Sequence, residues 1–140
     1  MKFMQEEVVI QSDGRELREV TGEVAAVVKD AGIHTGLCQV FIRHTSASLL
    51  INENADPDVL TDLETFFSDL VPDGDRRYVH TAEGPDDMSA HVRSALTQTE
   101  LSIPIREGRL ALGTWQGLFL WEHRTKPHRR RLIVSVWGVG

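Results

Sequence analysis

The chain has 140 residues, of which 41% are hydrophobic and 26% charged, a composition typical of one globular domain spanning residues 1–140. Its formal net charge of −6 argues against a general nucleic-acid-binding protein held by phosphate contacts. The N-terminal residues include early acids and no long apolar stretch, which argues against a signal peptide or membrane span and favours a cytoplasmic protein. The single cysteine, Cys38, excludes an internal disulfide and a cysteine-rich zinc module.

Strands and helices are predicted to mix in the first half of the chain. Apolar alternation predicts strands over residues 6–11, 37–43 and 48–53. A helix capped by Thr21 and ending at Gly32 is predicted, because Val24, Val27, Val28 and Ala31 follow three- and four-residue spacing. Cys38 falls in an apolar strand, which favours a buried thiol over a nucleophile.

Two more helices and then only strands are predicted in the second half. The helix starting at Pro57 carries one apolar stripe, made of Val59, Leu60, Leu63, Phe66, Phe67 and Leu70. The helix starting near Asp86 carries a second stripe, made of Met88, Val92, Ala95 and Leu96. The final strands are predicted over residues 101–105, 110–112, 117–123 and 132–137. This order predicts an α+β fold, a single compact domain with a largely antiparallel or mixed β-sheet and about three helices.

The densest group of polar side chains lies between His44 and Pro57, in the segment HTSASLLINENADP. On a strand, Asn52 and Glu53 point to opposite faces, and Asn54 falls on the side of Asn52. Asp56 before Pro57 predicts the start of a helix, whose free N–H groups and dipole favour anions. The alternative is that these residues only form a turn and a helix cap.

The chain has six histidines, and none forms the HxxxH pair of a readable metal motif. A metal site made of His44, His80 and His91 would require the fold to bring a strand end, a loop and a helix together. Three imidazoles suit zinc, nickel or a similar ion, and an open fourth position would allow Lewis-acid chemistry. Asp87 lies one helical turn before His91, where its carboxylate can orient the imidazole. The alternative is a set of scattered surface or core histidines.

A second dense segment surrounds Trp115 and Gln116, between Gly113 and Gly117. The glycines allow a close approach of the backbone to a ligand and the tryptophan offers a stacking surface, although a β-bulge with a core tryptophan is the alternative. Glu122 is a candidate general base or metal-site orienter, or else an exposed glutamate at a strand end.

Signatures of nucleophilic catalysis and phosphate binding are absent from the sequence, which has no GxSxG elbow, GxxxxGK[ST] loop or GxGxxG. Ser46 or Ser48 would need a neighbouring base that the sequence does not identify. The basic run at residues 124–131 could meet an acidic surface or a phosphorylated ligand, or be a solvated loop.

Four segments together resemble one family: HTSASLLINENADPDV at residues 44–59, YVHTAEGPDDMSAHVRSAL at 78–96, SIPIREGRLALGTWQGLFLWEH at 102–123, and the closing RRRLIVSVWG. On these motifs the chain is identified as a member of the YjbQ-like family, often labelled secondary thiamine-phosphate synthase. The resemblance implies a homotrimer with sites at subunit boundaries and with His44, His80 and His91 as metal ligands. The other polar positions of the family motif fall on Asn52, Glu53, Asp56, Trp115, Gln116 and Glu122.

The resemblance implies weak coupling of a hydroxymethylpyrimidine diphosphate to a thiazole phosphate, at a histidine-rich metal or phosphate site. Glu53, Glu122 and Asp56 are then the candidate catalytic residues, and the candidate substrate-binding residues are Asn52, Asn54, Trp115, Gln116 and Arg43. The divalent metal would be zinc or similar, or magnesium if the diphosphate chemistry is genuine. The alternatives are a non-catalytic trimeric protein that binds a metal or a metabolite, and a metal-dependent hydrolase. In each case we expect a small phosphorylated or heterocyclic metabolite as ligand, and neither nucleic acid nor membrane as partner.

Overall fold

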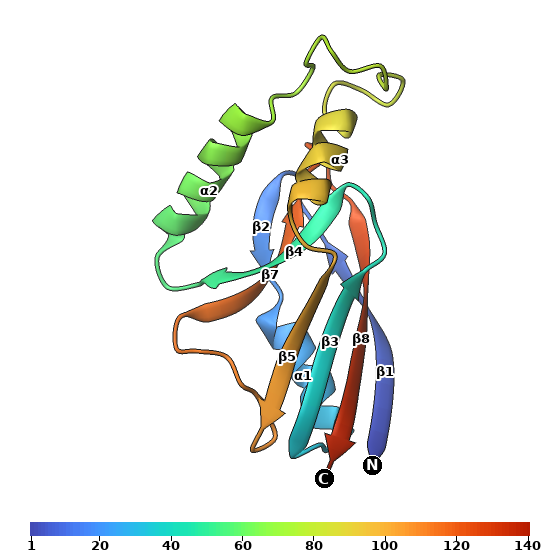
Figure 1. Ribbon diagram of the computed structural model, residues 1–140, viewed down its shortest axis with the longest axis vertical. Coiled ribbons are helices and arrows are strands. Elements are labelled where there is room, and N and C mark those ends of the chain that lie inside the picture. The colour runs from blue at the N-terminus through green and yellow to red at the C-terminus, as the bar shows by residue number, and fades with distance from the viewer.

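Two antiparallel β-sheets enclose the core of the protein; one helix packs against both sheets, a second packs beside the smaller sheet and a third lies to one side (Figure 1). The computed structural model describes all 140 residues. The strands are β1 (Lys2–Gln11), β2 (Glu16–Glu19), β3 (Thr35–Ile42), β4 (Ala47–Glu53), β5 (Glu100–Arg106), β6 (Arg109–Leu110), β7 (Gln116–Glu122) and β8 (Arg129–Val139). The helices are α1 (Thr21–Ala31), α2 (Pro57–Leu70) and α3 (Asp87–Leu96). The predicted α+β class and its three helices are confirmed.

The strands form a five-stranded sheet in the order β1-β8-β3-β5-β6 and a three-stranded sheet in the order β2-β7-β4. Every pairing is antiparallel, as expected for a chain whose second half is almost entirely strands. The four-residue β2 was not predicted. Its segment ELRE lacks an apolar alternation, and it pairs with β7 through the backbone.

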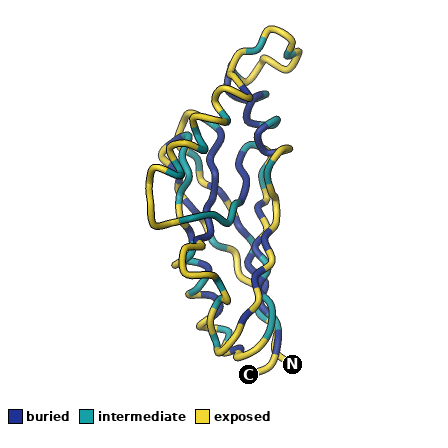
Figure 2. The backbone as a smooth tube through the Cα atoms, turned by 60° about the vertical axis from the view of Figure 1, so that its left-hand side comes forward, coloured by how far each residue is buried: buried dark blue, intermediate teal, exposed yellow.

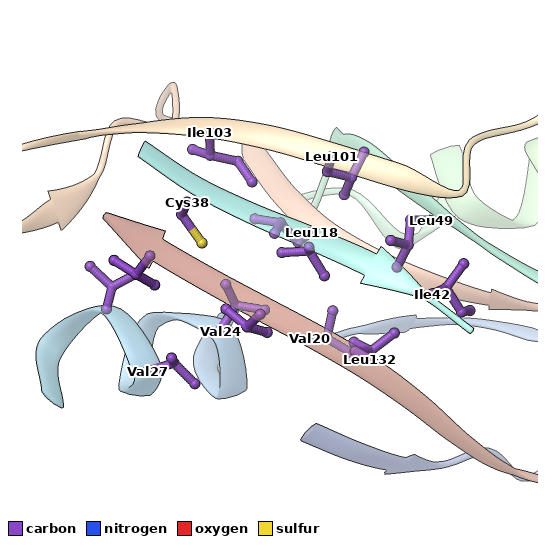
Figure 3. Close-up of a cluster of buried hydrophobic side chains, with 14 of the residues drawn as sticks. Val20, Val24, Val27, Cys38, Ile42, Leu49, Leu101, Ile103, Leu118 and Leu132 are labelled. Atoms are coloured by element: carbon purple, nitrogen blue, oxygen red, sulfur yellow. The ribbon is translucent and has the colours of Figure 1, made fainter. Parts of the chain in front are cut away.

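The core comprises 19 buried apolar residues contributed by both sheets and by α1 (Figure 3). Alternate residues of the central strands point into it, such as Cys38, Val40 and Ile42 of β3. Burial raises the pKa of the Cys38 thiol to about 12, so this cysteine is an inert core residue, as predicted. α1 adds a stripe of valines and ends at Gly32, which adopts the left-handed conformation expected of a helix-terminating glycine.

Thr21 is the first residue of α1 and not its cap, which corrects the prediction. Val20 occupies the cap position and contributes no side-chain hydrogen bond. The Thr21 hydroxyl instead accepts from the backbone N–H of Leu118 and donates to Glu19, so it ties the start of the helix to β7 and β2.

The apolar stripe predicted on α2 is present, but it is only partly covered. No residue of α2 is buried, and Phe66 and Leu70 are 60% and 54% exposed. Figure 1 shows α2 standing off from the sheets, and Figure 2 shows largely exposed backbone over the connection from α2 to α3. Periodicity correctly identified an amphipathic helix, but the chain covers only part of its apolar face, where the Phe67 ring packs edge-on against Trp121 with ring centroids 4.7 Å apart.

α3 buries the face opposite to the predicted one. Its buried residues are Asp87, Ser89, Ala90, Arg93 and Ser94, whereas Leu96 of the predicted stripe is 56% exposed. The buried Arg93 donates to Glu64 Oε1 of α2 over 2.6 Å, and Glu64 Oε2 accepts from the Trp121 indole over 2.8 Å. This single carboxylate therefore anchors α2 to both α3 and β7. None of the three helices is long and apolar enough to cross a membrane.

Candidate functional site

Two histidines and one carboxylate meet at the N-terminal end of α3. Asp87 and His91 lie one turn apart on the helix, and His80 comes from the connection before it. The Asp87 Oδ2 atom accepts from His80 Nε2 over 2.7 Å and from His91 Nε2 over 3.1 Å. The candidate ligand atoms of all three residues lie within 4.8 Å of one another. The predicted pairing of Asp87 with His91 is thus present, and His80 joins it.

The second oxygen of Asp87 is held by Arg124, from the loop after β7. Arg124 Nη1 donates to Asp87 Oδ1 over 2.8 Å, while its Nε donates to Asp86 Oδ2 over 3.1 Å. Arg124 Nη2 also donates to the backbone carbonyl of Glu83 over 3.0 Å, in the segment that carries His80. One guanidinium therefore fixes both the carboxylate and the loop, leaving Oδ2 directed at the imidazoles.

The charges within this group support one another. The hydrogen bond to Asp87 raises the pKa of the His80 imidazole. Burial opposes ionisation of Asp87, yet the hydrogen bond from His80 and the charge of Arg124 lower the pKa of its carboxyl. Asp87 is therefore an anion at neutral pH, as a metal ligand must be.

Two imidazole nitrogens and one carboxylate oxygen are a donor set that suits zinc and related ions. The His80 and His91 side chains are 41% and 34% exposed, so an ion can reach them, while Asp87 is buried beneath. Three protein donors leave a coordination position for water or another ligand, and a metal held this way would supply Lewis-acid chemistry. Magnesium fits less well, because it prefers oxygen ligands.

His44 lies outside this group in the single chain. It follows β3 and is half-buried, with its Nε2 accepting from the backbone N–H of Arg131 over 2.7 Å. Arg130 Nη1 lies 3.4 Å from its Nδ1, and burial together with the Arg130 charge lowers the pKa of His44. Of the three predicted histidine ligands, the fold brings together His80 and His91 and replaces His44 by Asp87. Arg43, a predicted substrate residue, is exposed next to it.

Glu122 is completely buried at the end of β7, and both its oxygens are occupied. Oε1 accepts from Ser12 Oγ over 2.7 Å and from Arg130 Nε over 2.8 Å, and Oε2 accepts from the backbone N–H of Arg124 over 3.1 Å. The structure thus places Glu122 beneath the site, where it orients the loop bearing Arg124. It is not the exposed strand-end glutamate that was the alternative.

The remaining predicted site residues gather at the opposite end of the β4–β7 pair: Asn52, Glu53, Asn54, Asp56, Trp115 and Gln116. Asp56 caps α2 by accepting from the Asp58 N–H over 2.9 Å, as predicted. Trp115 is 62% exposed, which excludes the core-tryptophan alternative. The strand register pairs Glu53 with Gln116 at this end and Ala47 with Glu122 at the other. Six residue steps of about 3.3 Å separate the two ends by roughly 20 Å.

Sequence reasoning missed a buried hydrogen-bonded pair between Ser48 of β4 and His123, the residue after β7. His123 Nε2 lies 2.8 Å from Ser48 Oγ, which in turn accepts from Thr97 Oγ1 over 2.7 Å. Burial, with the charges of Arg93 and other arginines, lowers the pKa of His123 to about 3. Ser48 therefore does have a neighbouring base, but both residues have no solvent exposure, so the pair is structural here. The only signal in the sequence was the position of His123 at the end of an apolar strand.

Comparison with known proteins gives one consistent match. The family model described as UPF0047 protein YjbQ-like matches residues 6–139. A UPF0047 protein from Synechocystis sp. is 61% identical over 134 residues, covering 96% of this chain and 91% of that protein. The UPF0047 protein YjbQ of Escherichia coli O157:H7 is 40% identical, covering 97% of this chain and 99% of that protein.

Solved structures agree with the fold. A crystal structure of an uncharacterised conserved protein of the YjbQ/UPF0047 family from Clostridium acetobutylicum has a TM-score of 0.87 at 32% identity, covering 94% of this chain and 99% of that one. A protein of unknown function from Sulfolobus solfataricus P2 has a TM-score of 0.84 at 27% identity, covering 97% and 99%.

These matches overturn the expected thiamine-phosphate synthase activity. The relatives are described as UPF0047 proteins, the solved structures as uncharacterised or of unknown function, and none of these names gives that activity. The geometry agrees, since the group offers one carboxylate oxygen beside two imidazole nitrogens, whereas magnesium on a diphosphate prefers oxygen ligands. Residues 6–139 carry the whole family match, and the chain belongs to the UPF0047 YjbQ-like family.

Proposed function

We propose that this protein binds a divalent transition metal of the zinc class through His80, Asp87 and His91. The observation that carries the proposal is the position of one buried carboxylate oxygen, 2.7 Å and 3.1 Å from two partly exposed imidazole nitrogens. Replacing the two shared hydrogens by one cation would satisfy all three donors with small shifts of the rings. The open position would hold an oxygen atom of a small phosphorylated or heterocyclic metabolite.

The surroundings of Asp87 support a metal site over an ordinary surface ion pair. A metal-binding group is usually braced by outer hydrogen bonds that fix the orientation of its ligands. Arg124 supplies this brace to the far oxygen of Asp87, and Glu122 in turn accepts from the Arg124 backbone N–H. A surface ion pair needs no such buried support.

Metal content of the purified, tag-free protein tests the proposal directly. Elemental mass spectrometry should find near-stoichiometric zinc, nickel or a similar metal in the parent chain, and little in His80→Ala or His91→Ala. The matched control is His34→Ala, because His34 is exposed and its ring hydrogen-bonds only to the Thr35 hydroxyl. Retention of metal in His44→Ala would support His80, Asp87 and His91 as the ligands and exclude His44.

The proposal fails if the folded parent binds no zinc when it is added, or if His91→Ala binds zinc as tightly as the parent. Circular dichroism on each variant distinguishes a lost site from a lost fold. Isothermal titration with zinc provides the affinity in each case.

We propose further that the chain assembles into a homotrimer. Its support is the apolar surface left open, because Phe66 and Leu70 of α2 are 60% and 54% exposed and Val79, beyond α2, is 97% exposed. Assembly would also allow the two polar ends of the β4–β7 pair to contribute to one site, since a neighbouring subunit can bridge a distance that one chain cannot. Sedimentation velocity should give the mass of three chains, and Phe66→Asp should reduce it. A parent protein that sediments as a monomer at micromolar concentration would contradict the assembly.

A further inference from the structure

A cleft of about 450 Å³ lies beside His80, formed by the connection between α2 and α3. Its lining includes Arg76, Tyr78, Pro85 and Met88 together with His80 itself. The backbone N–H of Gly74 donates to the Pro85 carbonyl over 2.9 Å and so ties the two limbs of the connection together. The cleft therefore has a defined shape, and it shares a residue with the candidate metal group.

The charge in this cleft comes from one unpaired arginine. Asp75 also lines it, but Arg77 donates to both Asp75 oxygens, over 3.0 Å and 2.6 Å, and the backbone N–H of Arg77 adds a third bond. These bonds lower the pKa of Asp75 to about 2 and use its acceptor capacity. Arg76, in contrast, forms no hydrogen bond or ion pair within the chain. Its guanidinium is free to pair with an anion from outside.

The other walls of the cleft are suited to an organic group. Tyr78 offers a half-buried ring whose hydroxyl has no hydrogen-bond partner in the chain, and Pro85 and Met88 add apolar surface. Small-molecule sites typically combine such apolar walls with a few polar groups that set the orientation of the ligand. A volume of about 450 Å³ exceeds what a bare inorganic anion needs and falls within the range of metabolite sites.

We infer that this cleft binds a small organic metabolite by its oxyanion group, a phosphate or a carboxylate, with Arg76 as the anchoring cation. Arg76 would form a charge-assisted, bidentate contact with the oxyanion, and Tyr78 would donate a hydrogen bond. His80 belongs to both the cleft and the metal group, so the bound anion lies next to the metal ligands. The inference deepens the proposed metal function and rests on it for the second charge that attracts the ligand.

Cobalt(II) in place of zinc gives a test that does not depend on activity. The full-length protein is loaded with one equivalent of cobalt and titrated with inorganic phosphate and, separately, with malonate. Thermal denaturation and the visible cobalt spectrum are followed together. We expect at least one of the two anions to stabilise the protein and to change the spectrum, with an affinity about tenfold weaker in Arg76→Ala, because a charge-assisted contact is lost. Arg106→Ala is the matched control, since Arg106 is exposed on β5, also lacks an ion pair, and lies outside the cleft.

The outcomes separate this inference from the metal proposal. If cobalt binds but neither anion has an effect, or if Arg76→Ala and Arg106→Ala weaken the anion equally, the cleft assignment is overturned and the metal site stands. If cobalt does not bind, the metal proposal is overturned. The thermal titration of metal-free protein then tests whether the cleft binds the anion. A weaker anion affinity in Arg76→Ala supports the cleft assignment, and an unchanged affinity overturns it. A response to phosphate alone or to malonate alone identifies the oxyanion.

Discussion

Acidification should destabilise the protein through His123, which the fold holds neutral. This histidine has no solvent exposure, and its pKa is lowered to about 3 from an ordinary value of 6.5. Between these values the unfolded chain binds a proton at this ring and the folded chain does not. The stability contributed by the neutral ring is therefore fully present above pH 6.5 and is lost progressively as the pH falls towards 3.

The slope of this loss is about 1.4 kcal/mol per pH unit for one proton. At pH 4.5, two units below the ordinary histidine pKa, His123 alone should cost about 3 kcal/mol of the free energy of unfolding. Urea denaturation at pH 7 and pH 4.5 measures the total loss in the parent protein and in His123→Gln. The difference between the two losses isolates His123 from the carboxylates, and it should be about 3 kcal/mol. His34→Gln, at an exposed position, should behave as the parent.

Equal losses in the parent and in His123→Gln would refute the reasoning, because the buried ring would then be taking up its proton in place. Should His123→Gln fail to fold, the histidine ring resonances of the parent protein give the same answer. A His123 resonance that titrates near pH 6.5 contradicts the depressed pKa, and one that stays constant down to pH 4.5 supports it.

Three further substitutions test other parts of the structure. Arg124→Gln should weaken zinc binding about 10- to 100-fold in isothermal titration, because Asp87 loses the partner of its outer oxygen, and an unchanged affinity would show that this brace is dispensable. Glu64→Ala should lower the free energy of unfolding in urea by about 2 kcal/mol, a discounted value for a partly exposed anion whose loss strands a buried arginine. A loss no larger than that of a surface alanine substitution would mean that α2 is held in another way. Gly36→Ala should lower the free energy of unfolding by more than about 3 kcal/mol, since the added Cβ would lie 2.1 Å from a backbone oxygen of β8. Gly22→Ala, which has open space around it, is the control and should not destabilise the protein. Similar losses in the two variants would be inconsistent with this packing.

Hydrophobic periodicity was sufficient to predict elements whose apolar residues are buried within the chain itself. α1 and β3 were predicted almost to their ends, because alternate or three-and-four-spaced side chains all enter the same core. β2 escaped prediction since its four residues pair with β7 through backbone groups and only one of them, Leu17, is apolar. Pairing of this kind leaves little trace in a sequence.

The outward helices show the limit of the same argument. A stripe such as Leu63, Phe66, Phe67 and Leu70 identifies an amphipathic helix but does not say what covers it. In α3 a polar face is buried in place of the apolar stripe. Arg93 on this face hydrogen-bonds to Glu64, and Asp87 hydrogen-bonds to both His80 and Arg124. Buried polar residues with complete partners can decide a helix orientation that hydrophobicity alone predicts wrongly.

The candidate site was predictable in so far as it is local. Asp87 and His91 are four residues apart on one helix, so their contact followed from spacing. Arg124 could not be found in this way, since it meets Asp87 across 37 residues of chain, and His44 was included although its ring is taken by the Arg131 backbone. Long-range partners of this kind can be identified only when the pairing and register of the strands are known.

The shared carboxylate oxygen of Asp87 also has a consequence for proton balance. Because it accepts from both His80 and His91, each Nε2 carries a hydrogen when no cation is present. An arriving metal needs those same nitrogens as lone-pair donors, so each ring must shift its proton to Nδ1 or release it to solvent. Loading of the site would then compete with protons, and an acidic environment would favour the empty protein while an alkaline one would favour the loaded form.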